Sequence, residues 1–159
     1  MKPDKRGDSG GAPAIYPVED ARAKTNHLSS QILDMIGITD GQVTEGGAGV
    51  SLCHEDPDHL YRMRHPWSIY EVAPEKLKAG FQRLQEQLPK HGWKIVSYGP
   101  DTSPNRNLEI IADFGKGPFS VNASLHITGK SGTEQPMIQV DVVSGCFRAP
   151  EGTDLDKEF

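Results

Sequence analysis

The chain has 159 residues, of which 35% are hydrophobic and 25% charged, with a net charge of -5 and a mean hydropathy of -0.54. This length suits one domain with a single core. The acidic balance, without a basic stripe, argues against a nucleic-acid-binding protein. No apolar run approaches the roughly 18 residues that a membrane-spanning helix requires.

Both ends of the chain are predicted to be flexible tails around one folded unit. Residues 1–17 are rich in Lys, Asp, Gly, Ser and Pro and offer almost nothing to bury, and residues 151–159 are mostly acidic. The single domain is therefore expected to span residues 18–150. The N-terminal tail looks like the spacer left when a secretion signal is removed and a start Met is added, so the natural chain is expected to begin upstream.

Two helices are predicted. In residues 18–36, side chains that can be buried recur at spacings of three and four before Gly37, namely Ala21, Thr25, Leu28, Ile32 and Met35. The second helix begins at Pro74, where a proline is tolerated in the first turn, and ends near Pro89. Its apolar stripe consists of Leu77, Phe81, Leu84 and Leu88.

Six extended segments are predicted around these helices. Two lie between the helices, at residues 50–53 and 60–72, and Pro66 is expected to interrupt the second. Four follow the second helix, at residues 93–98, 108–114, 119–127 and 137–144. Strict alternation of apolar and polar residues in the later segments indicates strands with one buried face and one solvent-exposed face. We therefore predict an α+β fold of order α-β-β-α-β-β-β-β, in which two helices cover one face of an antiparallel sheet of four to six strands.

Cys53 and Cys146 are the only cysteines in the chain. Alternate residues of a strand face the same side, so Cys146 is expected to face the core if the last strand extends that far. Cys53 lies at the end of another extended segment. A disulfide between them would close a loop of about 94 residues and constrain the unfolded state by roughly 4 to 5 kcal/mol at most. The alternative is two reduced cysteines that are buried as small hydrophobic side chains.

One catalytic motif occurs in the N-terminal tail. Residues 7–11, GDSGG, match the peptide around the nucleophilic serine of trypsin-like proteases. Those enzymes need a histidine and an aspartate from earlier in a double β-barrel, so we interpret the match as chance. The phosphate loop and the dinucleotide fingerprint are absent. We expect no catalytic residue, no cofactor and no enzyme.

The acidic turn at residues 54–59 contains the best local set of metal ligands. Its two imidazoles, His54 and His59, lie within six residues of three carboxylates. Zinc accepts such ligands, but the spacing matches no known site. An ordinary surface loop is the preferred interpretation, and no metal is predicted.

Residues 61–70 combine aromatic and basic side chains more densely than any other segment. Tyr, Trp and Arg commonly anchor protein contacts, although the same pattern fits an edge strand whose aromatic residues cap the core. If the protein binds a partner, the candidate surface comprises Arg62, Arg64, Trp67, Tyr70 and, on the polar face of a later strand, His126.

Four segments together resemble the small secreted lipoproteins of actinomycete bacteria. They are LPKHGWKI at 88–95, AD at 112–113, FSVN at 119–122 and VVSGCFRAPEG at 142–152. The resemblance covers residues 64–152 and implies a signal peptide with a lipid-modified cysteine, a spacer and one compact domain outside the membrane. It favours the disulfide, and it implies no activity and no catalytic residues.

The sequence thus predicts an extracytoplasmic, lipid-anchored, non-enzymatic binding domain on the outer face of the cell membrane. Its partner is expected to be a protein, an envelope component or a small molecule, not a nucleic acid. Membrane association is expected only through an anchor that precedes this chain. Two alternatives stay open: a cytosolic α+β enzyme or ligand-binding protein with reduced cysteines, and an immunity or inhibitor protein for a secreted toxin.

Overall fold

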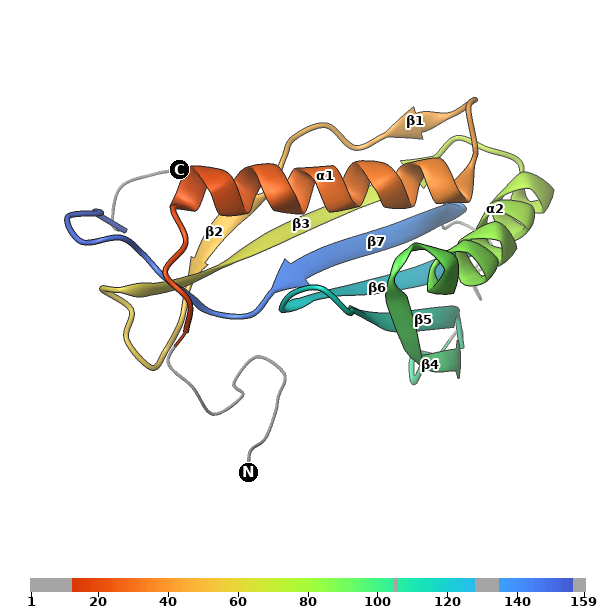
Figure 1. Cartoon of the computed structure of the whole chain (residues 1–159). Coiled ribbons are helices and arrows are strands. Elements are labelled where there is room, and N and C mark those ends of the chain that lie inside the picture. The colour runs from red at the N-terminus through yellow and green to blue at the C-terminus, as the bar shows by residue number, and fades with distance from the viewer. Residues whose placement is uncertain (1–12, 105, 128–134, 156–159) are drawn as a thin grey trace.

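The computed structural model describes residues 13–104, 106–127 and 135–155. They form two α-helices, a 3-10 turn and an antiparallel eight-stranded sheet (Figure 1). The elements are α1 (Val18–Ile36), β1 (Gln42–Val43), β2 (Gly49–Leu52), β3 (Leu60–Tyr70), α2 (Pro74–Gln87), η2 (Pro89–His91), β4 (Trp93–Pro100), β5 (Leu108–Phe114), β6 (Phe119–His126), β7 (Met137–Ser144) and β8 (Phe147–Arg148). The predicted α+β class is confirmed, and two short strands, β1 and β8, join the expected six.

The sheet is organised around its longest strand, β3. The main strand order is β1-β3-β7-β6-β5-β4, and β2 and β8 also pair with β3. β1 and β2 lie on one side of β3, and β7, with seven residue pairs, and β8 lie on the other, since Tyr61 pairs with Leu52 of β2 and with Phe147 of β8. β4 forms the far edge of the sheet.

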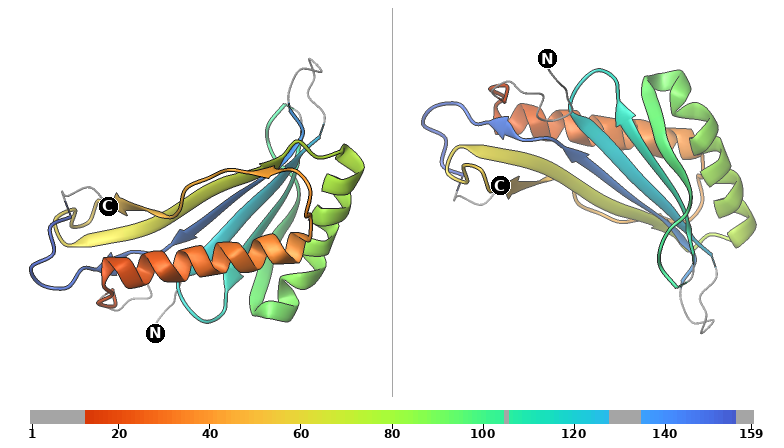
Figure 2. Two further views of the ribbon diagram at one scale, coloured as in Figure 1. Left: turned by 90° about the horizontal axis from the view of Figure 1, so that it is seen from above. Right: turned by 90° about the horizontal axis from the view of Figure 1, so that it is seen from below.

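Both helices pack against the same face of the sheet. α1 contacts β3 and β7, and α2 contacts α1, β7 and β6. Figure 2 shows α1 lying across the strands when the molecule is seen from above, and the strands in front of α1 when it is seen from below. All the side chains predicted for the two helix stripes are buried. No helix of the described ranges covers the opposite face, which we call the open face.

The two helices meet closely at Gly80 of α2. A Cβ atom there would lie 2.9 Å from side-chain atoms of Ile36 and Ile38, so this position needs glycine. α1 ends at Gly37, whose φ of 72° is left-handed. The Nε group of Arg83 donates to the carbonyl of Ile36 at 2.8 Å, which ties the last turn of α1 to α2.

Pro66 lies inside β3 and does not interrupt it, contrary to the prediction. Successive N–H groups of a strand point to opposite sides. The N–H of Met63 donates toward β7, to Ser144, and that of Ser68 donates the other way, to Thr44. Residues 66 and 68 are two apart, so their backbone nitrogens point to the same side of β3. The nitrogen of Pro66, which carries no hydrogen, therefore faces the gap between β1 and β2. The proline is accommodated because residues 44–48 leave the sheet at this point.

Both predicted tails contribute to the folded unit. Tyr16 donates from its N–H to the carbonyl of Arg148 at 3.0 Å, and the N–H of Arg148 donates to the carbonyl of Ala14 at 2.8 Å. At the other end, Leu155 is 6% exposed and belongs to the core. The core therefore extends beyond residues 18–150. The motif at residues 7–11 lies outside the described residues.

Cys53 and Cys146 form a disulfide, with their Cα atoms 6.4 Å apart. The prediction that Cys146 continues the alternation of the last strand is wrong, because β7 ends at Ser144. Phe147, at 3% exposure, faces the core, and Cys146 is only half-buried. The bond connects the residues that follow β2 and precede β8, two strands that both pair with β3.

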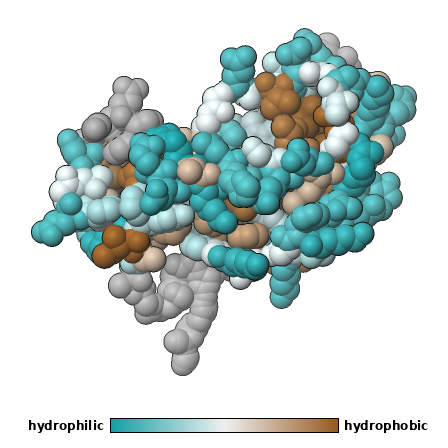
Figure 3. All heavy atoms as spheres, turned by 45° about the horizontal axis from the view of Figure 1, so that its top comes forward, coloured by the Kyte–Doolittle hydropathy of each residue, from teal (hydrophilic) through white to brown (hydrophobic). Residues whose placement is uncertain are grey.

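The surface on the α1 side is mainly hydrophilic, with hydrophobic side chains in separate small patches (Figure 3). The exposed large hydrophobic residues of the described ranges are Ile15, Val43, Leu52, Val96 and Tyr98. No helix in these ranges is long and apolar enough to cross a membrane.

Candidate functional site

β3 divides the predicted binding residues between the two faces of the sheet. Trp67 is 4% exposed, and its Nε1 group donates to the Ser29 hydroxyl of α1, so it faces the helices. Because side chains alternate along a strand, Arg62, Arg64 and Tyr70 face the opposite way. The residues 61–70 are therefore not one surface. Trp67 is part of the core, whereas the other three lie on the open face.

The strand register extends the open face across four adjacent strands, because directly opposite residues of paired strands share a face. Its residues are Arg62, Arg64, Pro66, Ser68 and Tyr70 of β3; Met137, Gln139, Asp141 and Val143 of β7; Ser120, Asn122, Ser124 and His126 of β6; and Glu109, Ile111 and Asp113 of β5.

One row of this face joins two of the predicted residues. Tyr70 lies opposite Met137, which lies opposite His126. The amide nitrogen of Asn107 is 3.0 Å from Nδ1 of His126 and donates to it, and Ser124 Oγ is 2.8 Å from Nε2. Nδ1 is therefore an acceptor, and the neutral ring carries its proton on Nε2. The imidazole is thus fixed in the surface.

Further hydrogen bonds connect neighbouring strands across the face. Nη2 of Arg64 donates to Oδ2 of Asp141 at 2.7 Å. Asn122 donates to Glu109 at 3.0 Å. The side chains are therefore held in place before any ligand arrives, which lowers the entropic cost of binding. The face carries arginines on β3 and carboxylates on β5 and β7, so it has no strong field of one sign.

Asp141, near the middle of the face, has one carboxylate oxygen without a partner. Oδ2 accepts from Arg64, whereas Oδ1 is buried and accepts no hydrogen bond from the described residues. A buried acceptor without a donor costs about 1–3 kcal/mol.

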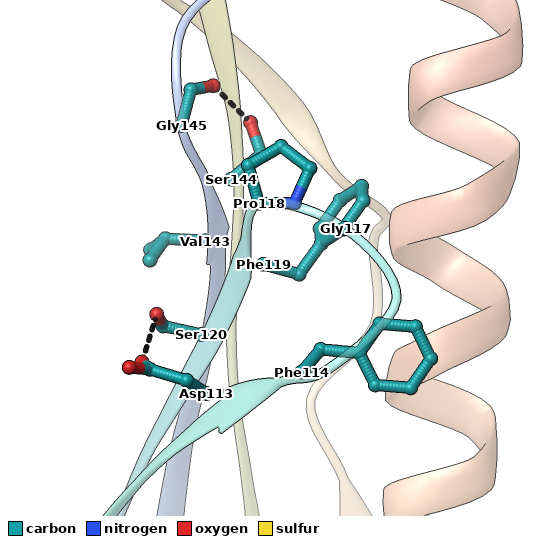
Figure 4. A pocket seen from close by; sticks show the side chains of 9 residues that line it. All are labelled: Asp113, Phe114, Gly117, Pro118, Phe119, Ser120, Val143, Ser144 and Gly145. Carbon is teal, nitrogen blue, oxygen red and sulfur yellow. Dashed lines mark hydrogen bonds between the residues drawn. The ribbon is translucent and has the colours of Figure 1, made fainter. Parts of the chain in front are cut away.

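A pocket of 380 Å³ lies at one end of the open face, around the hairpin that joins β5 and β6. Figure 4 shows Asp113 and Ser120 together on one side, where the Ser120 hydroxyl donates to the carboxylate at 2.7 Å. Phe114 and Phe119 provide apolar lining. The N–H of Gly145 donates to the carbonyl of Pro118 at 2.6 Å and joins the hairpin to the end of β7. The pocket combines hydroxyl and carboxylate groups with aromatic carbon.

Two serine–histidine pairs occur among the described residues, and neither has the geometry of a nucleophile and its base. Ser124 contacts the Nε2 group of His126, which carries the proton and cannot accept another. Ser29 lies 2.7 Å from Nδ1 of His65, but it is 4% exposed and its oxygen accepts a hydrogen bond from Trp67 at 3.2 Å. This second pair joins α1 to β3.

The two weak metal candidates do not meet at one site. Nδ1 of His59 lies 3.0 and 3.1 Å from the two carboxylate oxygens of Asp56. Within the described ranges, the group of three ligand-type residues with convergent atoms is Cys53, Glu55 and Cys146. Their sulfur atoms are joined in the disulfide and are not thiolate ligands. His54 belongs to no such group.

No protein-family model matches the chain, and neither a curated protein nor a solved structure matches it. The resemblance to secreted lipoproteins therefore stays a prediction. Among the site residues, Asp141, Asn122 and Gln139 were not predicted. The signal for them was present, because they occupy the polar positions of strands whose alternation had been recognised.

Proposed function

We propose that the protein is a non-enzymatic binding domain outside the cytoplasm, and that its open face binds a hydroxyl-rich polymer of the cell envelope, namely a polysaccharide. The observation that carries the proposal is an array of hydroxyl, amide and carboxylate groups on four adjacent strands, none of them covered by a helix of the described residues.

The chemistry of the array favours a neutral, hydroxyl-rich ligand. Ser68, Ser124 and Gln139 offer both donors and acceptors, and the partly exposed carboxylate of Asp141 offers an acceptor. A sugar hydroxyl both donates and accepts, so it matches such a mixed surface. A polyanion would need a positively charged surface, whereas this face has arginines only on β3 and carboxylates on β5 and β7.

Tyr70 and Met137 add an apolar element to the array. They lie side by side at one end of β3 and β7, and both are half-buried. A phenol ring offers an apolar surface together with a polar tip. The C–H face of a sugar ring can pack on such a surface while its hydroxyls reach the neighbouring polar groups.

The disulfide supports a location in an oxidising compartment, because disulfides are rare in the reducing cytosol. We propose that a lipid anchor on an upstream segment attaches the domain to the outer face of the membrane, as the resemblance implies. The genomic reading frame tests this part. A signal peptide and a lipid-attachment cysteine upstream would support it, and a native start at Met1 would contradict it.

Retention on immobilised envelope polysaccharide tests the binding function. Tyr70→Ala and Gln139→Ala are expected to weaken retention by about fivefold or more, which corresponds to about 1 kcal/mol. Their matched controls are Tyr98→Ala on β4, where the ring is 46% exposed, and Gln82→Ala on α2. The controls are expected to bind as the wild type does. Equal retention of all four variants, or none by the wild type, would overturn the proposal.

A further inference from the structure

A second cavity lies on the helix side of the sheet, between α1, β3 and residues 44–48. Its volume is 260 Å³. It exists because Pro66 offers no N–H to a neighbouring strand, so residues 44–48 leave β3 and pass toward α1. The apolar lining consists of Leu33, Val43 and Trp67, and the polar lining includes Asn26, Ser30 and His65.

Residues 44–48 are attached at both ends, and at the first of them Thr44 exchanges hydrogen bonds with Ser68 of β3. The Nη1 group of Arg22 donates to the carbonyl of Ala48 at 2.6 Å, and the N–H of Ala48 donates to Oδ1 of Asn26 at 2.9 Å. Ala48 itself is 2% exposed, whereas Gly46 and Gly47 are exposed. The two exposed glycines lie between the attachments at Thr44 and Ala48.

His65 directs a donor into this cavity. The Ser29 hydroxyl accepts from Trp67 and so donates to Nδ1 of His65, at 2.7 Å. The neutral ring then carries its proton on Nε2, which faces the carbonyl of Gly46 at 3.3 Å. That distance is beyond the usual range for such a bond, so a better acceptor can replace the carbonyl.

The cavity is rich in donors and has no acidic side chain. Among the described residues, no hydrogen bond engages the N–H groups of Gly46 and Gly47 or the amide nitrogen of Asn26. By contrast, Asp113 lines the cavity at the hairpin between β5 and β6, and Asp34 lines a cavity between α1 and α2. In a chain of net charge -5, a donor-rich cavity without a carboxylate selects a ligand that brings its own acceptors.

We infer that this cavity binds a small organic carboxylate with a short apolar body. The carboxylate accepts from Nε2 of His65, in place of the Gly46 carbonyl, and from the amide nitrogen of Asn26, and the body packs on Leu33, Val43 and Trp67. The inference is separate from the proposed function, since it concerns the other face of the sheet.

Protonation of His65 strengthens this binding. An imidazolium attracts a carboxylate, and the Ser29 hydroxyl can turn to accept from Nδ1. The charged residues on the surrounding elements are Arg22 of α1, Glu45 of the 44–48 segment and Asp141 of β7. Burial lowers the pKa of the ring below 6.5, and the Gly46 carbonyl and Asp141, which favour the protonated form, oppose that effect. Affinity is therefore expected to rise as the pH falls.

Titration of the full chain with sodium benzoate tests the inference, with benzyl alcohol as the neutral probe of the same shape and amide NMR signals as the readout. Benzoate is expected to saturate and to shift the Gly46 and Gly47 signals. His65→Gln is expected to weaken benzoate binding about fivefold or more near pH 5.5. His59→Gln, an exposed control, is expected to leave it unchanged.

Two outcomes would overturn the inference. One is benzyl alcohol binding as tightly as benzoate, and the other is His65→Gln binding as tightly as the wild type. If His65→Gln does not fold, Val43→Trp replaces it, because this 39% exposed strand residue lines the cavity and a larger ring would fill it. Undiminished benzoate binding by folded Val43→Trp would then contradict the site.

Discussion

Arg64 of β3 donates to one carboxylate oxygen of Asp141 in β7 at 2.7 Å, while the second oxygen of the same carboxylate is buried without a donor. The two residues are diagonal neighbours on the open face, because Arg64 lies opposite Val143. The pair orients Asp141 from one side and leaves it unsatisfied on the other. The orientation that Arg64 imposes holds the 28% exposed carboxylate in place to accept from a bound ligand.

Asp141→Asn is expected to separate binding from stability. The pair is partly exposed, with side-chain exposures of 47% and 28%, so its loss should cost less than about 1 kcal/mol. Polysaccharide retention should fall much further. Chemical denaturation and the retention assay measure the two effects. Asp40→Asn, which removes the exposed pair with Lys76, is the control and should change neither. A loss of stability without a loss of retention would count against the site.

Ser29→Ala is expected to destabilise the protein by about 1–3 kcal/mol, because it leaves Trp67 Nε1 and His65 Nδ1 without a partner between α1 and β3. Ser30→Ala is the matched control on the same helix. Ser30 is exposed, so its replacement should change the free energy of unfolding by less than about 0.5 kcal/mol. Equal denaturation midpoints for the two variants would contradict the structural role of Ser29.

Stability is expected to fall in mildly acidic solution because of His65. Burial lowers the pKa of this imidazole below its ordinary value of 6.5, against the opposing effects of the Gly46 carbonyl and Asp141. The unfolded chain then binds a proton at a higher pH than the folded chain does. The stabilisation that the neutral ring provides is complete at pH values above the pKa of His65 in the unfolded chain. It is lost as the pH falls toward the lowered pKa of His65 in the folded chain.

Urea denaturation at about pH 7.5 and about pH 5 measures this effect. The wild type should lose more stability between the two than His65→Gln does. His59→Gln removes a histidine that is exposed and should behave as the wild type. A pH dependence that is unchanged in His65→Gln would assign the effect to other groups.

Loss of the disulfide is expected to destabilise the protein by about 2–4 kcal/mol, because the bond spans 93 residues and restricts the unfolded chain. The Cys53→Ala, Cys146→Ala double variant and the reduced wild type should show similar lowered midpoints in urea. Reductant should leave the double variant unaffected. Equal urea midpoints for the reduced and the oxidised wild type would contradict a stabilising role of the disulfide.

The parts of the fold that follow from local periodicity were predictable from the sequence. The stripe from Ala21 to Met35 repeats at helical spacing, and Phe119 to Leu125 alternates. Both patterns arise because each element buries one face. The disulfide was also predicted, although Cys146 does not continue the alternation of β7.

The parts that depend on neighbours across the sheet were not predictable in the same way. Pro66 was expected to break its strand, but a proline is harmless where no partner strand needs its N–H, and only the tertiary structure reveals that gap. Trp67 was assigned to a surface because its face depends on where α1 packs. Leu155 was assigned to a tail because a single apolar residue after an acidic stretch carries no periodic signal.

Mapping of the amide NMR signals that change when envelope polysaccharide is added tests the central proposal most directly. The changes are expected to cluster on the open face, at positions such as Tyr70, Ser124 and Gln139, and to spare α1 and the cavity beside it. Changes confined to the helix side, or no changes at saturating polysaccharide, would contradict the account.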